Sequence, residues 1–460
     1  MDLKYELKKD GILPLYIQLY NCIRDDIMSG RIEDGVRLPS RRKLCVDMQI
    51  SKNTVDVAYQ KLVDDGYLIS KPRSGFYARR NSPVNTNIDE PDYYNKDGIL
   101  YTMSHNGMDI SAIPSDALAK LYREITFDEP ELFGFGHKFG EKILRQAINK
   151  YLYNDMGISC GSSQIIIGAG TDYIIEQLCH IFDERALAAF ENPCFARSYM
   201  PVKNSTLKSC LIDTKYNDFD FEEFEKSGAN ILYLITAHQF PLGYSISDST
   251  REKLLNWLAE KPERYIIEED NDMCFWEEKP FVPLFKSDTS GRVIFIGSFR
   301  STLSPAIKTA YAVLPRELKA RFNERLPYYT SLASRIEQRV IAEYILSGKY
   351  ERQLKKLRQI YTAKRRRLIS EVNSALGDKV KLLGENCGTF IPASVDSKLN
   401  EQQLRKMAAD VGVKFISVAD CCITVNEKLP RNTFIFGFGD MTETEISEAV
   451  KRIAAAWENC

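Results

Sequence analysis

Two groups of polar residues in this chain have the types and spacing that recognition of a phosphate-bearing partner requires. Lys52, Asn53 and Thr54 project from the first turn of a short amphipathic pattern. Their charge, amide and hydroxyl groups suit phosphates and base edges. The second group is the run GAGT at residues 168–171, where an apolar strand passes into a helix. Backbone N–H groups at a helix N-terminus form a phosphate site, although glycines at such a place also simply permit a tight turn.

The first group depends on two helical runs and a hairpin. One run follows Ser40, whose hydroxyl suits a helix N-cap, and ends at Gln49. In the second run, apolar positions at helical spacing form one face: Val55, Ala58, Tyr59 and Leu62. Residues 67–69 and 76–78 form a hairpin around a basic turn at residues 71–75. This order predicts a winged helix-turn-helix whose second helix enters the major groove. The alternative is a small helical domain with a basic surface.

Residues 13–78 resemble the winged-helix domain of the GntR family of bacterial regulators, through LPSRR, SKNTVDVAY and GYLISKPRSGFY. The resemblance implies DNA contacts from seven residues: Ser40, Arg42, Lys52, Asn53, Thr54, Ser74 and Gly75. Asp56 stands where many relatives carry arginine, and we exclude it because a carboxylate repels phosphate. Residues 1–80 carry a net charge of +4, against −1 for the whole chain. This basic part would bind DNA in a salt-dependent way.

Length and composition limit the possible domain organisation and location of the protein. At 460 residues it divides into two or more domains. We expect a DNA-binding domain at 1–78, a linker rich in Asn, Asp and Pro at 79–100, and a larger domain at 101–460. The longest apolar runs are far too short to span a bilayer and no signal peptide is present, so we expect a cytoplasmic protein without a membrane partner. Eleven cysteines without metal-ligand spacing predict reduced thiols and no metal site.

From residue 101 onward, helical runs alternate with short apolar strands, which is typical of an α/β fold. We expect strands at 164–168, 187–190, 231–235, 265–268 and 293–296, and helices at 116–125, 140–153, 172–182 and 249–260. Residues 334–374 form a long, charged helical run. After residue 380, shorter strands and helices predict a smaller α+β lobe.

The markers of residues 101–460 resemble the fold-type-I aminotransferase domain of MocR-type regulators. They are GAGTDYI at 168–174, ENPCF at 191–195, AHQFPLG at 237–243, EEDNDMCF at 268–275, GSFRSTLSPAIKTAY at 297–311 and FGFGDMTETEI at 436–446. The resemblance implies a three-layer α/β/α large lobe and a homodimer that reads two half-sites of a double-stranded operator. It also assigns a cofactor pocket to Ala169, Gly170, Thr171, Phe195, His238, Glu269, Asn271, Ser298, Arg300, Ser301 and Lys308.

The same resemblance indicates that this pocket lacks several of the residues with which the family binds its cofactor. The family's pyridoxal phosphate lysine falls on Ser301, and a hydroxyl cannot form an imine. Four further positions depart from the family: Phe195 and Asn271 replace tyrosines, Glu269 replaces an aspartate, and Lys308 replaces an arginine. We therefore expect no catalytic residues and no covalent cofactor. Three states of the pocket remain open: non-covalent pyridoxal phosphate, a different small anionic effector, or no ligand.

Two rival interpretations of the large domain remain. The first is an active transaminase that uses another lysine, with Lys308 the first candidate. The second is a scaffold that only dimerises. Without a cofactor, His238 is equally well explained as a residue that supports the fold, and Arg300 and Lys308 as solvated charges.

Overall fold

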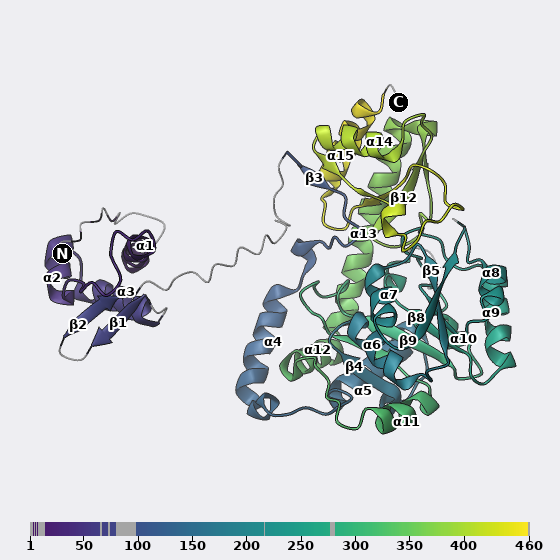
Figure 1. The fold of residues 1–460 in the computed structure, drawn as a ribbon, viewed down its shortest axis with the longest axis horizontal. Helices are drawn as coiled ribbons and strands as arrows, with labels where there is room; N and C mark the ends of the chain where they lie inside the picture. Colours follow the sequence, from purple (N-terminus) through teal and green to yellow (C-terminus); the bar gives the residue numbers. More distant parts are fainter. Residues whose placement is uncertain are drawn as a thin grey trace. The chain divides into compact units, whose positions relative to one another are not determined.

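The computed structural model describes residues 3, 5, 7, 14–64, 67–71, 74–79, 98–215, 217–276 and 281–458. The chain forms two compact units, Met1–Asn95 and Lys96–Cys460 (Figure 1). Most of the expected linker, residues 80–97, lies outside the described residues, as do Leu13 and the hairpin residues Pro72 and Arg73. Each unit is therefore described by itself.

The first unit has three helices and a β-hairpin. The elements are α1 (Leu15–Met28), α2 (Arg41–Met48), α3 (Lys52–Asp64), β1 (Leu68–Lys71) and β2 (Gly75–Ala78). The antiparallel register runs from Leu68 opposite Ala78 to Lys71 opposite Gly75. The predicted apolar face of α3 is fully buried, and it shares one core with three residues of α1: Val55, Ala58, Tyr59 and Leu62 with Leu19, Ile23 and Ile27. The predicted helix-turn-helix and wing are confirmed.

The second unit is built on a seven-stranded sheet with the order β4-β10-β9-β8-β7-β5-β6. Its strands are β4 (Ile165–Gly168), β5 (Leu187–Asn192), β6 (Lys208–Asp213), β7 (Ile231–Leu234), β8 (Tyr265–Glu269), β9 (Val293–Ser298) and β10 (Ala310–Val313). Only β10 runs antiparallel to its neighbours. The sequence did not predict β6 or β10. β6 is a half-exposed edge strand, and two of the four residues of β10 are alanines, which are depleted in strands.

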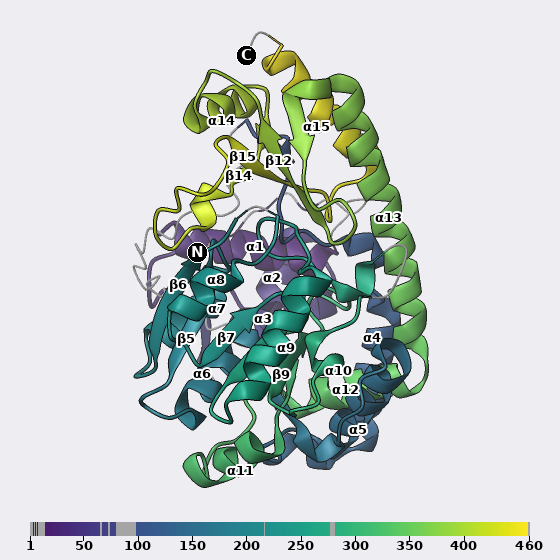
Figure 2. The same ribbon diagram turned by 90° about the vertical axis from the view of Figure 1, so that its right-hand side faces the viewer.

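Helices cover both faces of this sheet. They are α4 (Ser115–Asp128), α5 (Lys142–Tyr151), α6 (Thr171–Ile181), α7 (Ala196–Lys203), α8 (Phe221–Lys226), α9 (Asp248–Glu260), α10 (Leu284–Ser287), α11 (Arg316–Arg325) and α12 (Arg335–Leu346). In β7, Ile231 and Tyr233 pack with α6 and α7, whereas Leu232 and Leu234 pack with α8 and α9. Both faces of the strand are buried, which confirms the α/β/α layers (Figure 2).

The long helical run of residues 334–374 is divided, contrary to the expectation of continuous helix. α12 ends at Leu346 and α13 (Lys349–Ala375) begins after Gly348, whose φ of +70° is left-handed and stops the first helix. α13 contacts α12 in the large lobe and α15 in the small lobe, so it connects the two lobes (Figure 2).

The small lobe is an antiparallel sheet covered by helices, as predicted. The sheet has the order β11-β12-β15-β14, and its elements are β11 (Val380–Leu382), β12 (Phe390–Val395), α14 (Glu401–Asp410), β14 (Ile416–Ser417), β15 (Thr433–Gly437) and α15 (Glu443–Ala456). β13 (Val413–Lys414) pairs in parallel with β3 (Tyr101–Thr102), so the start of the unit is fixed to this lobe. Among the described residues, no helix has the length and apolar composition needed to cross a bilayer.

Candidate functional site

The first turn of α3 presents two free polar side chains. Ser51 caps the helix, because its Oγ accepts a hydrogen bond from the Thr54 backbone N–H at 3.1 Å. The Thr54 hydroxyl lies 2.8 Å from the same oxygen and is therefore engaged within the turn. Lys52 and Asn53 are exposed. Of the three predicted contacts on α3, these two are the most available to a partner.

The other predicted contacts lie on α2 and the wing. Ser40 caps α2 by accepting from the Lys43 backbone N–H at 3.2 Å, and Arg42 is exposed. The Ser74 hydroxyl pairs with the Tyr77 hydroxyl at 2.6 Å. Gly75 has a φ of +116°, and a side chain there would approach the Arg37 guanidinium at 3.3 Å. Arg37 is exposed beside the wing, and no pattern in the sequence singled it out.

Arg41 joins α2, α3 and the wing. Its guanidinium lies 4.7 Å from the centre of the Phe76 ring in β2. Its Nη1 atom lies 3.4 Å from Asp56 Oδ1 in α3. The Tyr59 ring packs edge-on against Phe76 at 5.0 Å, and its hydroxyl donates to the Pro39 carbonyl at 2.9 Å. These contacts hold the recognition helix and the wing together.

In the second unit, the predicted pocket residues follow the carboxyl ends of the parallel strands. Residues 169–171 follow β4, Phe195 follows β5, and His238 follows β7. Ser298 is the last residue of β9, and Arg300 and Ser301 follow that strand. Glu269 ends β8, Asn271 follows it, and Lys308 precedes β10. Ligands of open α/β sheets bind at this edge.

Only four of these residues line the cavity at that edge: Phe195, Asn271, Arg300 and Ser301. The cavity measures about 40 Å³. The Arg300 guanidinium donates to Asn106 Oδ1. Burial and the nearby Arg197 lower the pKa of Arg300. Burial, Arg300 and Arg197 also lower the pKa of His105 to about 4, so that this imidazole is neutral at physiological pH.

Glu269 and His238 are buried at the margin of this cavity. The Glu269 carboxylate accepts hydrogen bonds from the Tyr233 hydroxyl and, at 3.3 Å, from the Ser198 hydroxyl. Burial raises its pKa, and these hydroxyl donors oppose the shift. His238 Nδ1 lies 3.3 Å from Asp272 Oδ2, and the imidazole Nε2 has no hydrogen-bond partner among the described residues. Two hydroxyl groups of the protein, those of Tyr233 and Ser198, therefore donate to the Glu269 carboxylate.

The turn between β4 and α6 lies outside the cavity. Gly170 caps α6 with a φ of +116°, and Thr171 is buried. Ala169 lines a separate open hollow of about 480 Å³ together with Arg197. The Lys308 carbonyl is close to Gly170, but the Lys308 side chain is exposed. The structure thus brings Lys308 beside the turn without placing its amine in the cavity.

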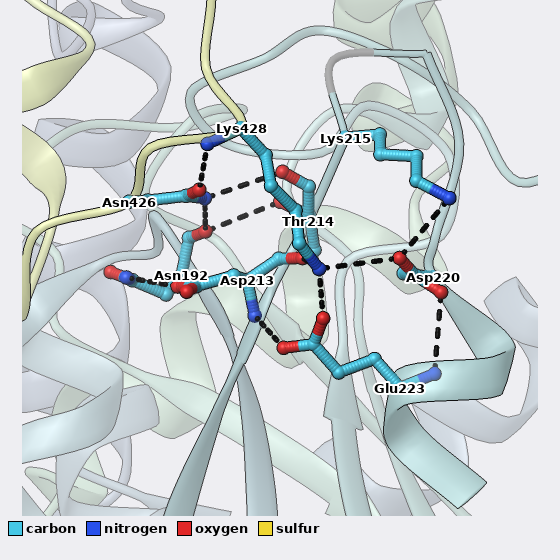
Figure 3. Close-up of polar contacts among 8 residues, drawn as sticks. All are labelled: Asn192, Asp213, Thr214, Lys215, Asp220, Glu223, Asn426 and Lys428. Atoms are coloured by element: carbon cyan, nitrogen blue, oxygen red, sulfur yellow. Dashed lines mark hydrogen bonds and ion pairs between the residues drawn. The ribbon is translucent and has the colours of Figure 1, made fainter. Parts of the chain in front are cut away.

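A buried asparagine fixes the small lobe on the large lobe (Figure 3). Asn192, the last residue of β5, donates from Nδ2 to Asp213 Oδ1 at 2.7 Å and to the Thr424 carbonyl at 2.9 Å. Its Oδ1 accepts from the Ile423 backbone N–H at 3.0 Å. Its amide therefore binds both the large lobe and the segment 423–424 of the small lobe.

Asn426 and Lys428 extend this contact at the surface (Figure 3). Asn426 Nδ2 donates to the Asn192 carbonyl at 2.6 Å and to the Thr214 carbonyl at 3.3 Å. Lys428 donates to the Asp213 carbonyl at 2.9 Å and pairs with Glu223. Among the described residues, no group of three or more His, Cys, Asp or Glu side chains is arranged to hold a metal ion.

Comparison with known proteins agrees with both units. Residues 15–78 match the model of the bacterial regulatory proteins of the gntR family. The HTH-type transcriptional regulator YdeL of Bacillus subtilis is 31% identical over the full length of both chains. The probable rhizopine catabolism regulatory protein MocR of Rhizobium meliloti is 23% identical over 98% of this chain and 95% of its own.

Solved structures share the fold of the second unit. The multiple substrate aminotransferase of Thermococcus profundus superposes with a TM-score of 0.69 and 18% identity, over 78% of this chain and 91% of its own. The kynurenine aminotransferase of Pyrococcus horikoshii gives a TM-score of 0.68 and 19% identity over the same shares.

A GntR-type head and an aminotransferase fold in one chain define a class: transcriptional regulators with an aminotransferase-like domain. The chain belongs to the GntR family of bacterial regulatory proteins, and within it to the MocR-type regulators.

Proposed function

We propose that this regulator binds an operator in the cytoplasm as a homodimer, and that its aminotransferase-like unit is a non-catalytic sensor of a small anion. The observation that carries the proposal is the replacement of the amine by Ser301 in a cavity that Arg300 occupies. The exposed Lys52, Asn53 and Arg42 side chains support contact with DNA. Their phosphate and base contacts would hold each head on one half-site.

The residues present do not fit covalent pyridoxal phosphate. Ser301 offers a hydroxyl, which forms no imine. The Glu269 Oε2 atom accepts hydrogen bonds from Tyr233 and Ser198, which would compete with a pyridinium for that oxygen. Lys308, the rival amine, is exposed outside the cavity. We therefore assign no catalytic step to this site.

Positive charge at the cavity favours an anionic effector. The Arg300 guanidinium lines it, and Arg197 is close enough to lower the pKa of Arg300. A guanidinium binds carboxylate or phosphate with two parallel hydrogen bonds. Asn106, which now accepts from Arg300, would be displaced by such an anion. Asn106 lies four residues after β3, so binding would act on the segment near the start of the second unit.

An exposed aromatic surface supports the homodimer. Phe127 at the end of α4 is 87% exposed, Phe133 is 70% exposed, and Phe135 is fully exposed. Arg335 of α12 donates to the carbonyl of Gly134, so Phe133 and Phe135 flank the start of α12. Exposed apolar groups gathered at one place mark protein interfaces. A second copy of the chain would bury them.

The test of the non-catalytic assignment is borohydride reduction of protein incubated with pyridoxal phosphate, followed by peptide mass spectrometry. We expect no adduct in the wild type. The double variant Arg300→Ser, Ser301→Lys clears the guanidinium from the cavity and supplies the amine, so it should form a yellow, reducible adduct. Ser304→Lys, with a new amine three residues away, is the matched control. An adduct on Lys308 or any other native lysine at this site would refute the assignment.

A further inference from the structure

The recognition helix carries an acid on the face that its predicted DNA contacts share. Asp56 lies one helical turn after Lys52 and three residues after Asn53, positions that neighbour each other on a helix surface. The opposite face of α3 is the buried one. Val57, next to Asp56, is a further exposed position, at 39%. Asp56 therefore belongs to the surface that would enter the major groove.

An unpaired carboxylate at this place would repel the DNA phosphates, but Asp56 is paired with Arg41. Arg41 Nη1 lies 3.4 Å from Asp56 Oδ1, so the two charges neutralise each other. The Arg41 guanidinium is held from its other side by the Phe76 ring at 4.7 Å. The pair is thus fixed by the wing as well as by α2. A neutralised carboxylate can approach DNA without the penalty of a lone negative charge.

The contact also orients the carboxylate. Asp56 Oδ1 is buried and faces Arg41 as an ion pair, without a hydrogen-bond partner among the described residues, whereas 32% of the Asp56 side chain is exposed. The accessible oxygen is therefore Oδ2. This carboxylate oxygen is a hydrogen-bond acceptor.

We propose that Asp56 reads a base: its Oδ2 accepts a hydrogen bond from the N4 amino group of a cytosine in each half-site, and Arg41 is the residue that positions it. The inference rests on the proposed binding of DNA by this head. In the major groove, guanine and the O4 of thymine present acceptors, which repel a carboxylate, and adenine presents its N7 acceptor beside its N6 amino donor. Cytosine presents an amino donor, and aspartate is one of the side chains that accept from it.

The experiment is selection of bound sequences from a random double-stranded DNA library by the full-length protein. We expect the wild type to prefer cytosine at one position in each half-site. Asp56→Ala should lose that preference by about tenfold or more and keep the others. Asp56→Asn should move the preference at the same position to adenine, because asparagine pairs with the adenine N6 and N7 atoms. A purely structural role for Asp56 would not produce this change of base.

Two further variants separate charge from base reading. Asp47→Ala removes the same charge from an exposed position of α2 and should leave every base preference unchanged. Arg41→Met should weaken binding to all sequences and flatten the cytosine preference, because the carboxylate is then neither neutralised nor oriented. Unchanged preference in Asp56→Ala, or preference for guanine, thymine or adenine at that position in the wild type, overturns the inference. Selection of no sequence by the wild type overturns the proposed function itself.

Discussion

Replacing Asn192 by alanine should loosen the small lobe, whereas replacing the nearby Lys428 by methionine should not. Asn192 is fully buried and its amide serves two groups of the small lobe, the Ile423 backbone N–H and the Thr424 carbonyl. Lys428 makes its ion pair with Glu223 at the surface, with 36% of its side chain exposed. The two variants therefore remove contacts of the same interface that differ in burial.

The expected magnitudes follow from this difference. A hydrogen bond contributes about 0.5–1.5 kcal/mol net, so the two part-buried bonds that Asn192→Ala removes from Ile423 and Thr424 contribute about 1–3 kcal/mol. An exposed ion pair contributes about 0–1 kcal/mol. Since about 1–2 kcal/mol changes an opening equilibrium by about 5–30-fold, Asn192→Ala should open the contact at least about fivefold more often. For Lys428→Met the change should stay below about fivefold.

Hydrogen exchange of the amides in residues 420–428 measures this opening directly. The wild type and both variants are compared at one pH and temperature, with amides of the β12–β15 ladder as the internal reference. Equal acceleration in the two variants, or a larger effect of Lys428→Met, would refute the reasoning. It would mean that the exposed charges, rather than the buried amide, hold the lobes together.

Two more predictions concern pH and assembly. Burial raises the pKa of Glu191 from 4.5 to about 8, against the hydrogen bond that Tyr244 donates. The folded state then keeps a proton that the unfolded state releases, so this group makes stability fall as pH rises from about 4.5 to 8. Denaturant unfolding should show a smaller fall over this range in Glu191→Gln, and an identical fall would contradict it. Phe135→Asp, at a fully exposed position, should convert the proposed dimer to monomers in light scattering; a dimer in both proteins would exclude this surface as the interface.

Much of the architecture could be predicted because buried residues recur along the sequence at the spacing of a helix or form the continuous run of a buried strand. The apolar positions of α3 recur every three or four residues, and those of β7 are continuous because both faces of that strand are covered. β6 was missed because an edge strand is only half buried, and β10 because two of its four residues are alanines, which have a low preference for strands. The end of α12 depended on one residue, Gly348, whose left-handed backbone interrupts a pattern that otherwise continues.

The candidate sites also have a part that the sequence predicts and a part that depends on tertiary contacts. By itself the sequence determined which side chains are available: Lys52 and Asn53 on a helical first turn, and a hydroxyl at Ser301 that cannot form an imine. Only the tertiary structure decided what those side chains and their neighbours contact. Arg41 reaches Asp56 and Arg300 reaches Asn106 across 15 and 194 residues of chain. Such pairs follow from the packing of separate elements, which local spacing does not encode, and they set the charge that a partner would meet.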